Sequence, residues 1–239
     1  LASTISGGVA SATARNRLIV LKRILETAVE YGLISENPVD SVAFPRVERQ
    51  EMKFLSPAEV RRLLAACSES WRFLLALPAL CGLRKGECLA LEWSDIDTDA
   101  MTISVSKTMR FGHVTSPKTL NSRSIVPTPE FLIPLIDQRR RHSGGEGLVF
   151  CKSDGRPLSD SAPNRVLNSA LEKARLPHIR FHDLRHSFVV GHLKAGTDIK
   201  TLAHLGRFSS TTLLETYAHV LAAMGGEAVD RLDRLIRDS

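Results

Sequence analysis

Apolar residues recur at steps of three and four near the start of the chain, which predicts a helix over about residues 11–31. The face that this helix would bury consists of Ala14, Leu18, Leu21, Leu25 and Ala28. Ser11 or Thr13 could cap its first turn. Asn37-Pro38 ends the pattern, and the following residues up to Lys53 are basic, contain Pro45 and have no apolar period. The pattern therefore predicts a small helical unit followed by an extended basic linker.

A second and longer region begins with Ser56-Pro57-Ala58-Glu59, a capping box with proline at the first helical position. Helical spacing continues at about residues 71–80, 85–91, 131–141, 161–175, 182–195, 199–205 and 211–223. Residues 102–106 alternate as a strand does, and residues 124–126 are a candidate partner strand. The expected fold class is mostly α with a small antiparallel β-sheet.

The end of the chain carries one more amphipathic pattern. Its apolar residues are Val229, Leu232, Leu235 and Ile236. Met224-Gly225-Gly226 precedes them and is expected to act as a flexible joint before a terminal helix.

Composition narrows the class of protein. A chain of 239 residues with 43% hydrophobic and 24% charged residues can build a buried core and is typical of a globular protein. No stretch approaches the roughly 18 uninterrupted apolar residues of a membrane span, and the first ten residues do not resemble a signal peptide. Four cysteines without a C-x-x-C pair favour a reducing compartment. We expect a cytoplasmic protein of a bacterial cell or a phage-infected host.

The charge favours a polyanionic partner. Lys and Arg number 32 against 26 Asp and Glu, a formal net charge of +6, and nucleic acid is the partner that best matches this excess. We expect phosphate contacts from basic residues of the first helix and the linker, namely Arg15, Arg17, Lys22, Arg23, Arg46, Arg49 and Lys53. The alternative for the helix is an ordinary solvated face.

Three stretches carry candidate chemistry: residues 81–87 around Arg84, residues 181–187 around His182 and Arg185, and residues 205–219 with Tyr217. Two guanidinium groups match the paired oxygens of a phosphodiester and would stabilise a phosphoryl transition state. Tyr217 is a candidate nucleophile, His182 could accept its proton, and Lys118 could protonate a departing sugar oxygen.

Each of these residues also has an ordinary structural interpretation. An Arg after Gly-Leu is usually a surface residue, and Tyr217 could be a core aromatic side chain. A zinc site is a further alternative because His182 and His186 have helical spacing. No Glu follows the first histidine, however, and no cysteine lies nearby, so we expect neither a metal nor another cofactor.

Taken together, the three stretches resemble a known family. Gly82-Leu83-Arg84-Lys85-Gly86-Glu87, followed by residues 89–97, resembles the first arginine box of the tyrosine recombinases (phage integrases). Residues 182–188 resemble their second box, and residues 205–220 resemble the stretch that contains their nucleophile. Asn37-Pro38 is similar to the close of their core-DNA-binding domain.

The resemblance implies a role for each matching residue. Arg84 and Arg185 would hold the scissile phosphate, and Lys118 would be the general acid on the leaving 5′-oxygen. His182 would be the acid/base partner of the nucleophile Tyr217, and Glu87 would support the site by pairing with a neighbour.

One position departs from the family pattern. Arg207 follows Leu205-Gly206, where the family normally has His or sometimes Trp. An arginine can donate hydrogen bonds to a non-bridging phosphate oxygen, although it cannot transfer a proton at neutral pH. We expect Arg207 to join the other guanidinium groups at the phosphate. In the alternative, Arg207 points outward and His204 takes its place.

The resemblance also implies the organisation of the chain. Residues 1–44 would be a helical core-DNA-binding segment, residues 45–54 a linker, and residues 55–239 a catalytic domain with a C-terminal docking helix. The segment 1–44 is short for an independent domain and is expected to be incomplete.

The implied function is site-specific DNA recombination through a 3′-phosphotyrosyl intermediate, without metal or ATP. The partners would be double-stranded DNA sites and three further copies of the chain, which would be monomeric or weakly associated without DNA. The terminal helix would dock on a neighbouring copy or, alternatively, on its own domain. Two other functions are a catalytically silent DNA-binding regulator on the same fold and a relaxing enzyme similar to type IB topoisomerases.

Overall fold

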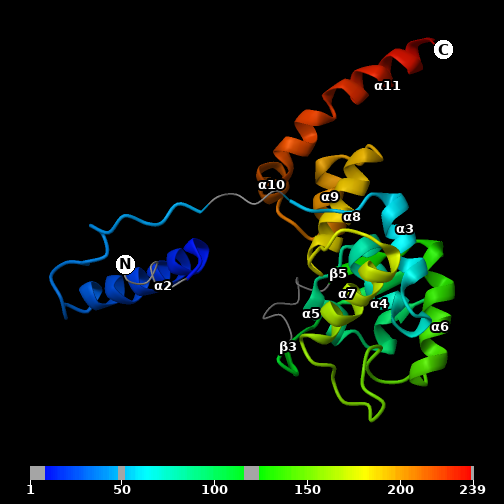
Figure 1. Ribbon diagram of the computed structural model, residues 1–239, viewed down its shortest axis with the longest axis horizontal. Coiled ribbons are helices and arrows are strands. Elements are labelled where there is room, and N and C mark those ends of the chain that lie inside the picture. Colours follow the sequence, from blue (N-terminus) through cyan, green and yellow to red (C-terminus); the bar gives the residue numbers. More distant parts are fainter. Residues whose placement is uncertain (1–8, 48–51, 116–123, 238–239) are drawn as a thin grey trace. The chain divides into compact units, whose positions relative to one another are not determined.

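The computed structural model describes residues 9–47, 52–115 and 124–237 (Figure 1). The chain separates into two compact units, Leu1–Glu51 and Met52–Ser239. The boundary falls within the predicted linker of residues 45–54. The mostly helical composition with small antiparallel sheets confirms the predicted fold class.

The first unit is built on helix α2 (Ser11–Glu30). No side chain caps this helix, since its N-cap residue is Ala10, so the prediction of a Ser11 or Thr13 cap is wrong. Of the predicted apolar face, Ala14 and Leu18 are buried, whereas Leu21 is 45% exposed.

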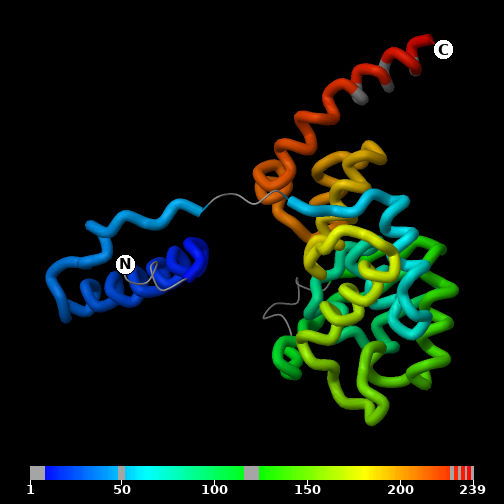
Figure 2. The backbone as a smooth tube through the Cα atoms, in the orientation of Figure 1, coloured from blue at the N-terminus to red at the C-terminus, as the bar shows by residue number. Residues whose placement is uncertain are grey.

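After α2 the chain folds back beside the helix (Figure 2). The Asn37 side chain closes this turn, because its Nδ2 donates to the Lys22 carbonyl (3.0 Å) and its Oδ1 accepts from the Val39 amide (3.0 Å). Arg15 donates to the Pro45 carbonyl (3.3 Å) and lies over the Phe44 ring. These contacts fasten the returning segment to α2.

The second unit opens with helix α3 (Pro57–Ala66), and the predicted capping box is confirmed. The Ser56 hydroxyl accepts from the Glu59 amide (3.3 Å), and the Glu59 carboxylate accepts from the Ser56 amide (2.8 Å). Each end of the motif satisfies one backbone donor that the helix itself leaves free.

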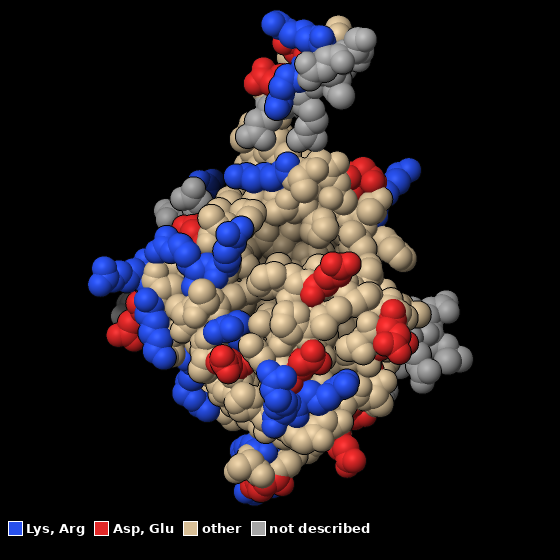
Figure 3. All heavy atoms as spheres, turned by 90° about the vertical axis from the view of Figure 1, so that its right-hand side faces the viewer, with Lys and Arg blue, Asp and Glu red and all other residues tan. Residues whose placement is uncertain are grey.

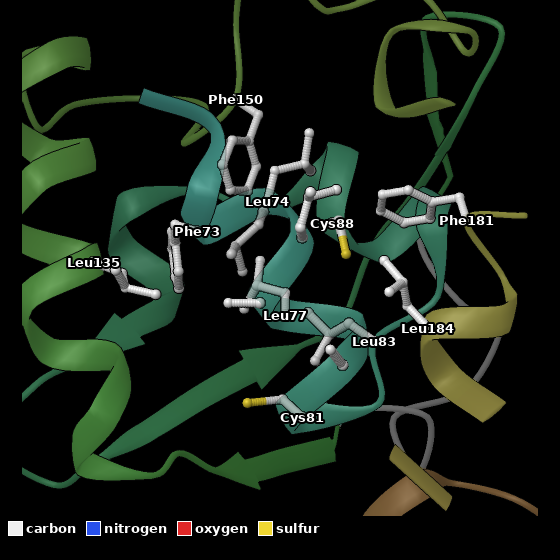
Figure 4. Close-up of a cluster of buried hydrophobic side chains, with 14 of the residues drawn as sticks. Phe73, Leu74, Leu77, Cys81, Leu83, Cys88, Leu135, Phe150, Phe181 and Leu184 are labelled. Carbon is white, nitrogen blue, oxygen red and sulfur yellow. The ribbon is translucent and has the colours of Figure 1, made fainter. Parts of the chain in front are cut away.

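Helix α4 (Glu69–Cys81) is the centre of the second unit. It packs against α6 (Ile133–Ser143) and α8 (Asp183–Lys194), and its residues from Phe73 to Leu77 are fully buried. Figure 4 shows side chains of this core, with Phe150, Leu135 and Leu184 converging on the helix. A helix that is apolar on all sides is typical of the middle of a domain.

The sheet is small. Strands β1 (Ile96–Asp97), β2 (Thr102–Val105) and β5 (Ser124–Pro127) form it in the order β1-β2-β5, all antiparallel. This confirms the predicted pairing of β2 with β5. Strands β3 (Thr108–Arg110) and β4 (His113–Thr115) form a separate hairpin that the hydrophobic pattern did not predict, because they contain little alternation.

The remaining elements surround this framework. They are α5 (Lys85–Ala90), η1 (Trp93–Asp95), η3 (Glu130–Leu132), α7 (Ala162–Ala174), α9 (Ile199–Gly206), α10 (Ser210–Ala223) and α11 (Gly225–Arg237). Among the helices of the described residues, none has the length and apolar character needed to cross a membrane.

The terminal helix differs from its prediction at one point. Gly225 and Gly226 are its first residues, so they do not form a flexible joint before it. Val229 and Ile236 are each 68% exposed, whereas the side chains of Leu232 and Leu235 lie outside the described residues. The helix thus presents apolar side chains that its own unit does not bury.

Candidate active site

The first arginine box lies at the turn between α4 and α5. Gly82 ends α4 with a positive φ of 63°, a conformation that glycine adopts without a steric cost. Arg84 is the N-cap residue of α5, and the Glu87 carboxylate accepts from both the Arg84 amide (2.7 Å) and the Arg84 guanidinium (2.8 Å). The guanidinium of Arg84 is thereby oriented, although its side chain remains 49% exposed.

Gly86 explains why this box needs its second glycine. A Cβ at this position would meet the hydroxyl of Thr108 and lie 2.8 Å from the carbonyl oxygen of Met109. Helix α5 can therefore approach strand β3 only because residue 86 has no side chain, and this contact sets the position of Arg84 and Glu87.

Arg185 lies in the first turns of α8 and is 1% exposed. Its guanidinium donates to the carbonyls of Gly82 and Gly206, which are the ends of α4 and α9. The Phe208 ring covers it, with the ring centroid 3.9 Å from Cζ. Burial and the repulsion from Arg84 and Arg207 lower the pKa of Arg185 to about 9, so the group stays charged at neutral pH.

Arg207 points into this site. It follows α9 in the left-handed conformation (φ 56°), and its Nη2 donates to the Glu87 carboxylate (2.6 Å). His204 is exposed on α9, so the structure favours the inward orientation of Arg207 over the alternative in which His204 replaces it. Glu87 therefore links two arginines, Arg84 and Arg207, that are 123 positions apart in the sequence.

Several guanidinium donors in this cluster have no acceptor. Within the described part of the chain, Nε of Arg185 and both Nε and Nη1 of Arg207 are buried and unpaired. Buried donors without partners are costly, and they are typical of sites that an absent ligand completes. An anion with several acceptor oxygens would satisfy them.

Tyr217 comes from α10 and is 2% exposed. Its hydroxyl lies 2.6 Å from Nδ1 of His186, one turn beyond His182 on α8. Burial raises the pKa of the Tyr217 phenol, while the positive charge of Arg185 acts in the opposite direction. Tyr217 is consequently a protonated phenol close to the guanidinium cluster.

His186 is the residue that the sequence reasoning missed. Burial and the neighbouring His182 lower the pKa of His186 to about 4, so the ring is neutral at pH 7. The signal was present in the sequence, since His186 follows Asp183 at helical spacing and adjoins Arg185. Only the packing of α10 on this part of the molecule shows that it touches the tyrosine.

Of the two predicted proton-transfer residues His182 and Lys118, only His182 lies within the described residues. His182 immediately precedes α8, is exposed, and its ring centroid lies 5.0 Å from that of His186. Although the residue is exposed as a whole, partial desolvation of its ring and the charge of Arg185 lower the pKa of His182, which favours the neutral ring. Lys118 lies outside the described residues, so its role stays a prediction.

The basic residues expected to contact DNA are not equivalent. Arg17, Arg23, Arg46 and Lys53 are exposed. Lys22 forms an ion pair with Asp40 (2.7 Å), Arg15 contacts Phe44 and Pro45, and Arg49 lies outside the described residues. On the face of the molecule in Figure 3, basic and acidic side chains are interspersed, so this face is not uniformly positive.

Comparison with known proteins identifies the family. The profile of the phage integrase family matches residues 53–224, which include Arg84, Arg185, Arg207 and Tyr217. This chain belongs to the phage integrase family. The match also includes His182 and His186 and ends at the last residue before α11.

Individual relatives agree with this assignment. The ICEBs1 integrase of Bacillus subtilis (strain 168) is 30% identical over 96% of this chain. The integrase of Mycobacterium phage D29 is 30% identical over 92% of it, and a XerC-like tyrosine recombinase of Caldanaerobacter subterraneus is 25% identical over 90%. This integrase-family chain spans 67%, 62% and 64% of those relatives, respectively.

Solved structures share the fold. The Tn1549 transposon integrase in complex with circular intermediate DNA superimposes with a TM-score of 0.78 at 22% identity, covering 98% of this chain and 83% of that one. A λ integrase dimer bound to a COC′ core site gives a TM-score of 0.68 at 19% identity, covering 90% and 61%. At these identities the similarity concerns the fold.

Proposed function

We propose that this chain is the core of a site-specific DNA recombinase that cleaves and rejoins strands through a 3′-phosphotyrosyl intermediate. The observation that carries this proposal is the group of unpaired guanidinium donors on Arg185 and Arg207, close to a buried tyrosine. A phosphodiester supplies both the anion that these donors lack and the phosphorus atom that a phenol can attack.

The arginines would act on the phosphate. Arg84, exposed and held by Glu87, would contact a non-bridging oxygen first. Arg185 and Arg207 would then stabilise the negative charge that builds on these oxygens in the transition state. Because the three side chains are fixed to one another through Glu87, Gly82 and Gly206, the arginines themselves would need little reorganisation during the reaction.

Bonds and protons balance in the cleavage step. The Tyr217 oxygen forms a bond to phosphorus, and the bond between phosphorus and the 5′-oxygen breaks. The tyrosine loses a proton to a base, and the departing 5′-oxygen gains one from a general acid, for which Lys118 is the candidate. The energy of the phosphodiester is retained in the phosphotyrosyl bond, so a 5′-hydroxyl of another strand can reverse the step without ATP.

Phe208 would have to move for Arg185 to reach the DNA. Its ring covers the guanidinium, and it lies between α9 and α10, one residue after Arg207. The Phe208 ring packs so closely on Gly206 that no side chain fits at this position. A Cβ on Gly206 would lie 3.4 Å from the Phe188 ring and would overlap the Phe208 ring. A shift of the Phe208 side chain would uncover the Arg185 guanidinium for the phosphate.

A nicked suicide substrate tests the proposal, because loss of the fragment below the nick prevents religation and traps the adduct. We expect a covalent protein–DNA adduct with the wild-type chain and none with Tyr217→Phe. Tyr31→Phe is a matched control, since Tyr31 is the other tyrosine of the chain and is 77% exposed. Absence of a wild-type adduct on DNA that the protein binds would favour the silent regulator.

The DNA products distinguish a recombinase from the relaxing enzyme similar to type IB topoisomerases. A recombinase exchanges strands between two copies of its site, whereas a relaxing enzyme changes only the supercoiling of one DNA. Recombinant products from paired sites are expected. Relaxation without recombinants would contradict the proposal.

We further propose that four copies assemble on two DNA sites through α11. Its Val229 and Ile236 are exposed, and burial of such residues against a neighbour would be favourable by about 1.5–3 kcal/mol each. Sedimentation of the DNA complex with and without residues 227–239 tests this. Unchanged assembly after truncation would contradict it.

A further inference from the structure

We propose that His186 is a catalytic residue of this chain, the base that takes the proton from Tyr217 when the tyrosine attacks phosphorus. The inference deepens the proposed function and rests on it. It assigns to His186 a step that the sequence assigned to His182.

The contact between the two side chains is direct. Nδ1 of His186 lies 2.6 Å from the Tyr217 hydroxyl oxygen, within the usual range for an O–H donor. The rings meet edge to face with centroids 5.8 Å apart, and the two residues come from α8 and α10. A base must lie within hydrogen-bond reach of the proton that it removes, and His186 meets this requirement.

The charge of Asp183 favours one tautomer of His186. Its Oδ1 lies 4.0 Å from Nε2 of His186, beyond hydrogen-bond distance, and its negative charge favours the tautomer that carries the proton on Nε2. Nδ1 then carries the lone pair that faces Tyr217. A carboxylate, an imidazole and a hydroxyl thus follow one another as in a catalytic triad, but here the carboxylate acts on the imidazole through its charge and not through a hydrogen bond.

Arg180 holds this carboxylate in place. Its amide donates to Oδ2 of Asp183 (2.7 Å) and its Nη2 donates to Oδ1 (2.8 Å), while Asp183 itself is 2% exposed. Burial alone would raise the pKa of Asp183, but the hydrogen bonds from Arg180 outweigh it and lower the pKa. The carboxylate is therefore charged and can stabilise the imidazolium that forms on His186.

The proton can be followed through both directions of the reaction. On cleavage, the O–H bond of Tyr217 breaks, an N–H bond forms on Nδ1 of His186, and the phenolate oxygen bonds to phosphorus. On rejoining, the phosphotyrosyl bond breaks and Nδ1 returns its proton to the tyrosine oxygen. His182, exposed at the start of α8, is left to face the DNA.

Cleavage rates on two substrates test the assignment. One carries the normal 5′-oxygen at the scissile bond, and the other carries a bridging sulfur, which leaves as a thiolate and needs no general acid. His186→Asn keeps a polar group near the position of Nδ1 but cannot take up a proton. We expect it to slow adduct formation by about 100-fold or more on both substrates, the contribution of a general base.

His192→Asn is the matched control. His192 lies on the same helix and also uses Nδ1 for a hydroxyl contact, to Thr197 (3.1 Å), but it does not belong to the site. Its rates should equal those of the wild type. His186→Gln provides a second variant, and DNA affinity with thermal unfolding verifies that each variant is folded.

Three results would overturn the inference. The first is a His186→Asn rate equal to or above the wild-type rate, which would make the contact only a restraint on a resting tyrosine. The second is recovery of that variant on the sulfur substrate, which would make His186 the general acid. The third is a slower rate on both substrates with His182→Asn and no change with His186→Asn. Failure of the proposed function itself would be recognised separately, by a wild-type chain that forms no Tyr217-dependent adduct.

Discussion

The two units of this chain bury apolar surface very differently. In the second unit, Phe73, Leu74 and Leu77 are completely inaccessible, and a continuous core extends from α3 to α8. In the described part of the first unit, the buried apolar side chains are Ala14, Leu18 and Val39. Four large apolar residues of α2 are exposed there, namely Ile19, Val20, Leu21 and Ile24.

This difference separates two sources of stability. The second unit is stabilised by its own core, which also holds the turn at Gly82 and the start of α8 against each other. The first unit is held by polar contacts such as those of Asn37 and by the pair of Lys22 with Asp40, and an exposed pair contributes about 0.2–1 kcal/mol. The first unit therefore depends more on polar contacts than on an apolar core.

The largest expected effect concerns DNA binding by the exposed arginines of the first unit. If about 6–10 DNA phosphates are neutralised, affinity for DNA should fall roughly 10³–10⁵-fold between 50 and 200 mM salt. Arg17→Ala with Arg23→Ala should reduce the slope of log affinity against log salt by about 0.9 for each phosphate that is no longer neutralised. Arg156→Ala is the control, because Asp154 already neutralises this arginine (2.6 Å). A salt-insensitive affinity would contradict the expected phosphate contacts.

The next effect compares the two cores directly. Leu74→Ala removes a fully buried side chain and should lower the free energy of unfolding by roughly 2–5 kcal/mol. Leu21→Ala, at a residue that is 45% exposed, should change it by no more than about 0.5 kcal/mol. Denaturant unfolding measures both. Equal decreases would show that the face of α2 around Leu21 is buried in solution.

A smaller effect follows from pH. The pKa of His186 is lowered from 6.5 to about 4 in the folded chain, so the unfolded chain binds more protons between these values. Stability should therefore decrease as pH falls from 6.5 to 4, by up to about 3 kcal/mol for this group. Unfolding of His186→Asn should show a weaker pH dependence over that range. A wild-type chain that is equally stable at pH 4 and pH 7 would exclude a buried neutral His186.

The smallest effect concerns helix starts in the two units. Ser56→Ala removes the cap of α3 and should cost about 1 kcal/mol in unfolding free energy. Ser11→Ala should cost a few tenths at most, because no side chain caps α2. A larger decrease at Ser11 than at Ser56 would reverse this assignment of the two caps.

The helices were predictable because their signals are local. The Ser56 capping box gave the start of α3, and the apolar spacing of residues 71–80 gave both ends of α4 to within two residues. The hairpin of β3 and β4 was not predictable in this way. Its turn relies on Phe111 and Gly112, both with positive φ, rather than on alternating apolar residues.

The site residues also divide into those that local motifs predict and those that they do not. Arg84, Arg185 and Tyr217 were selected from the sequence because they occur in recognisable motifs, and the structure brings Arg84 and Arg185 to the same turn at Gly82. The side chain that contacts Tyr217 was not selected, since the sequence indicated His182 as the proton acceptor and the structure places His186 against the Tyr217 hydroxyl. Both histidines are in the same motif, and nothing in their spacing says which of them α10 will cover.

The sequence alone therefore determined most of the helices and the family, and it supplied the candidate site residues other than His186, because these depend on residues that are neighbours along the chain. The tertiary structure decided which of these side chains meet. Glu87 joins Arg84 to Arg207, and His186 meets Tyr217, only because α5, α8, α9 and α10 pack around the end of α4. Such contacts depend on the rotation and distance of packed helices, and the physical forces that set them act between residues far apart in the sequence.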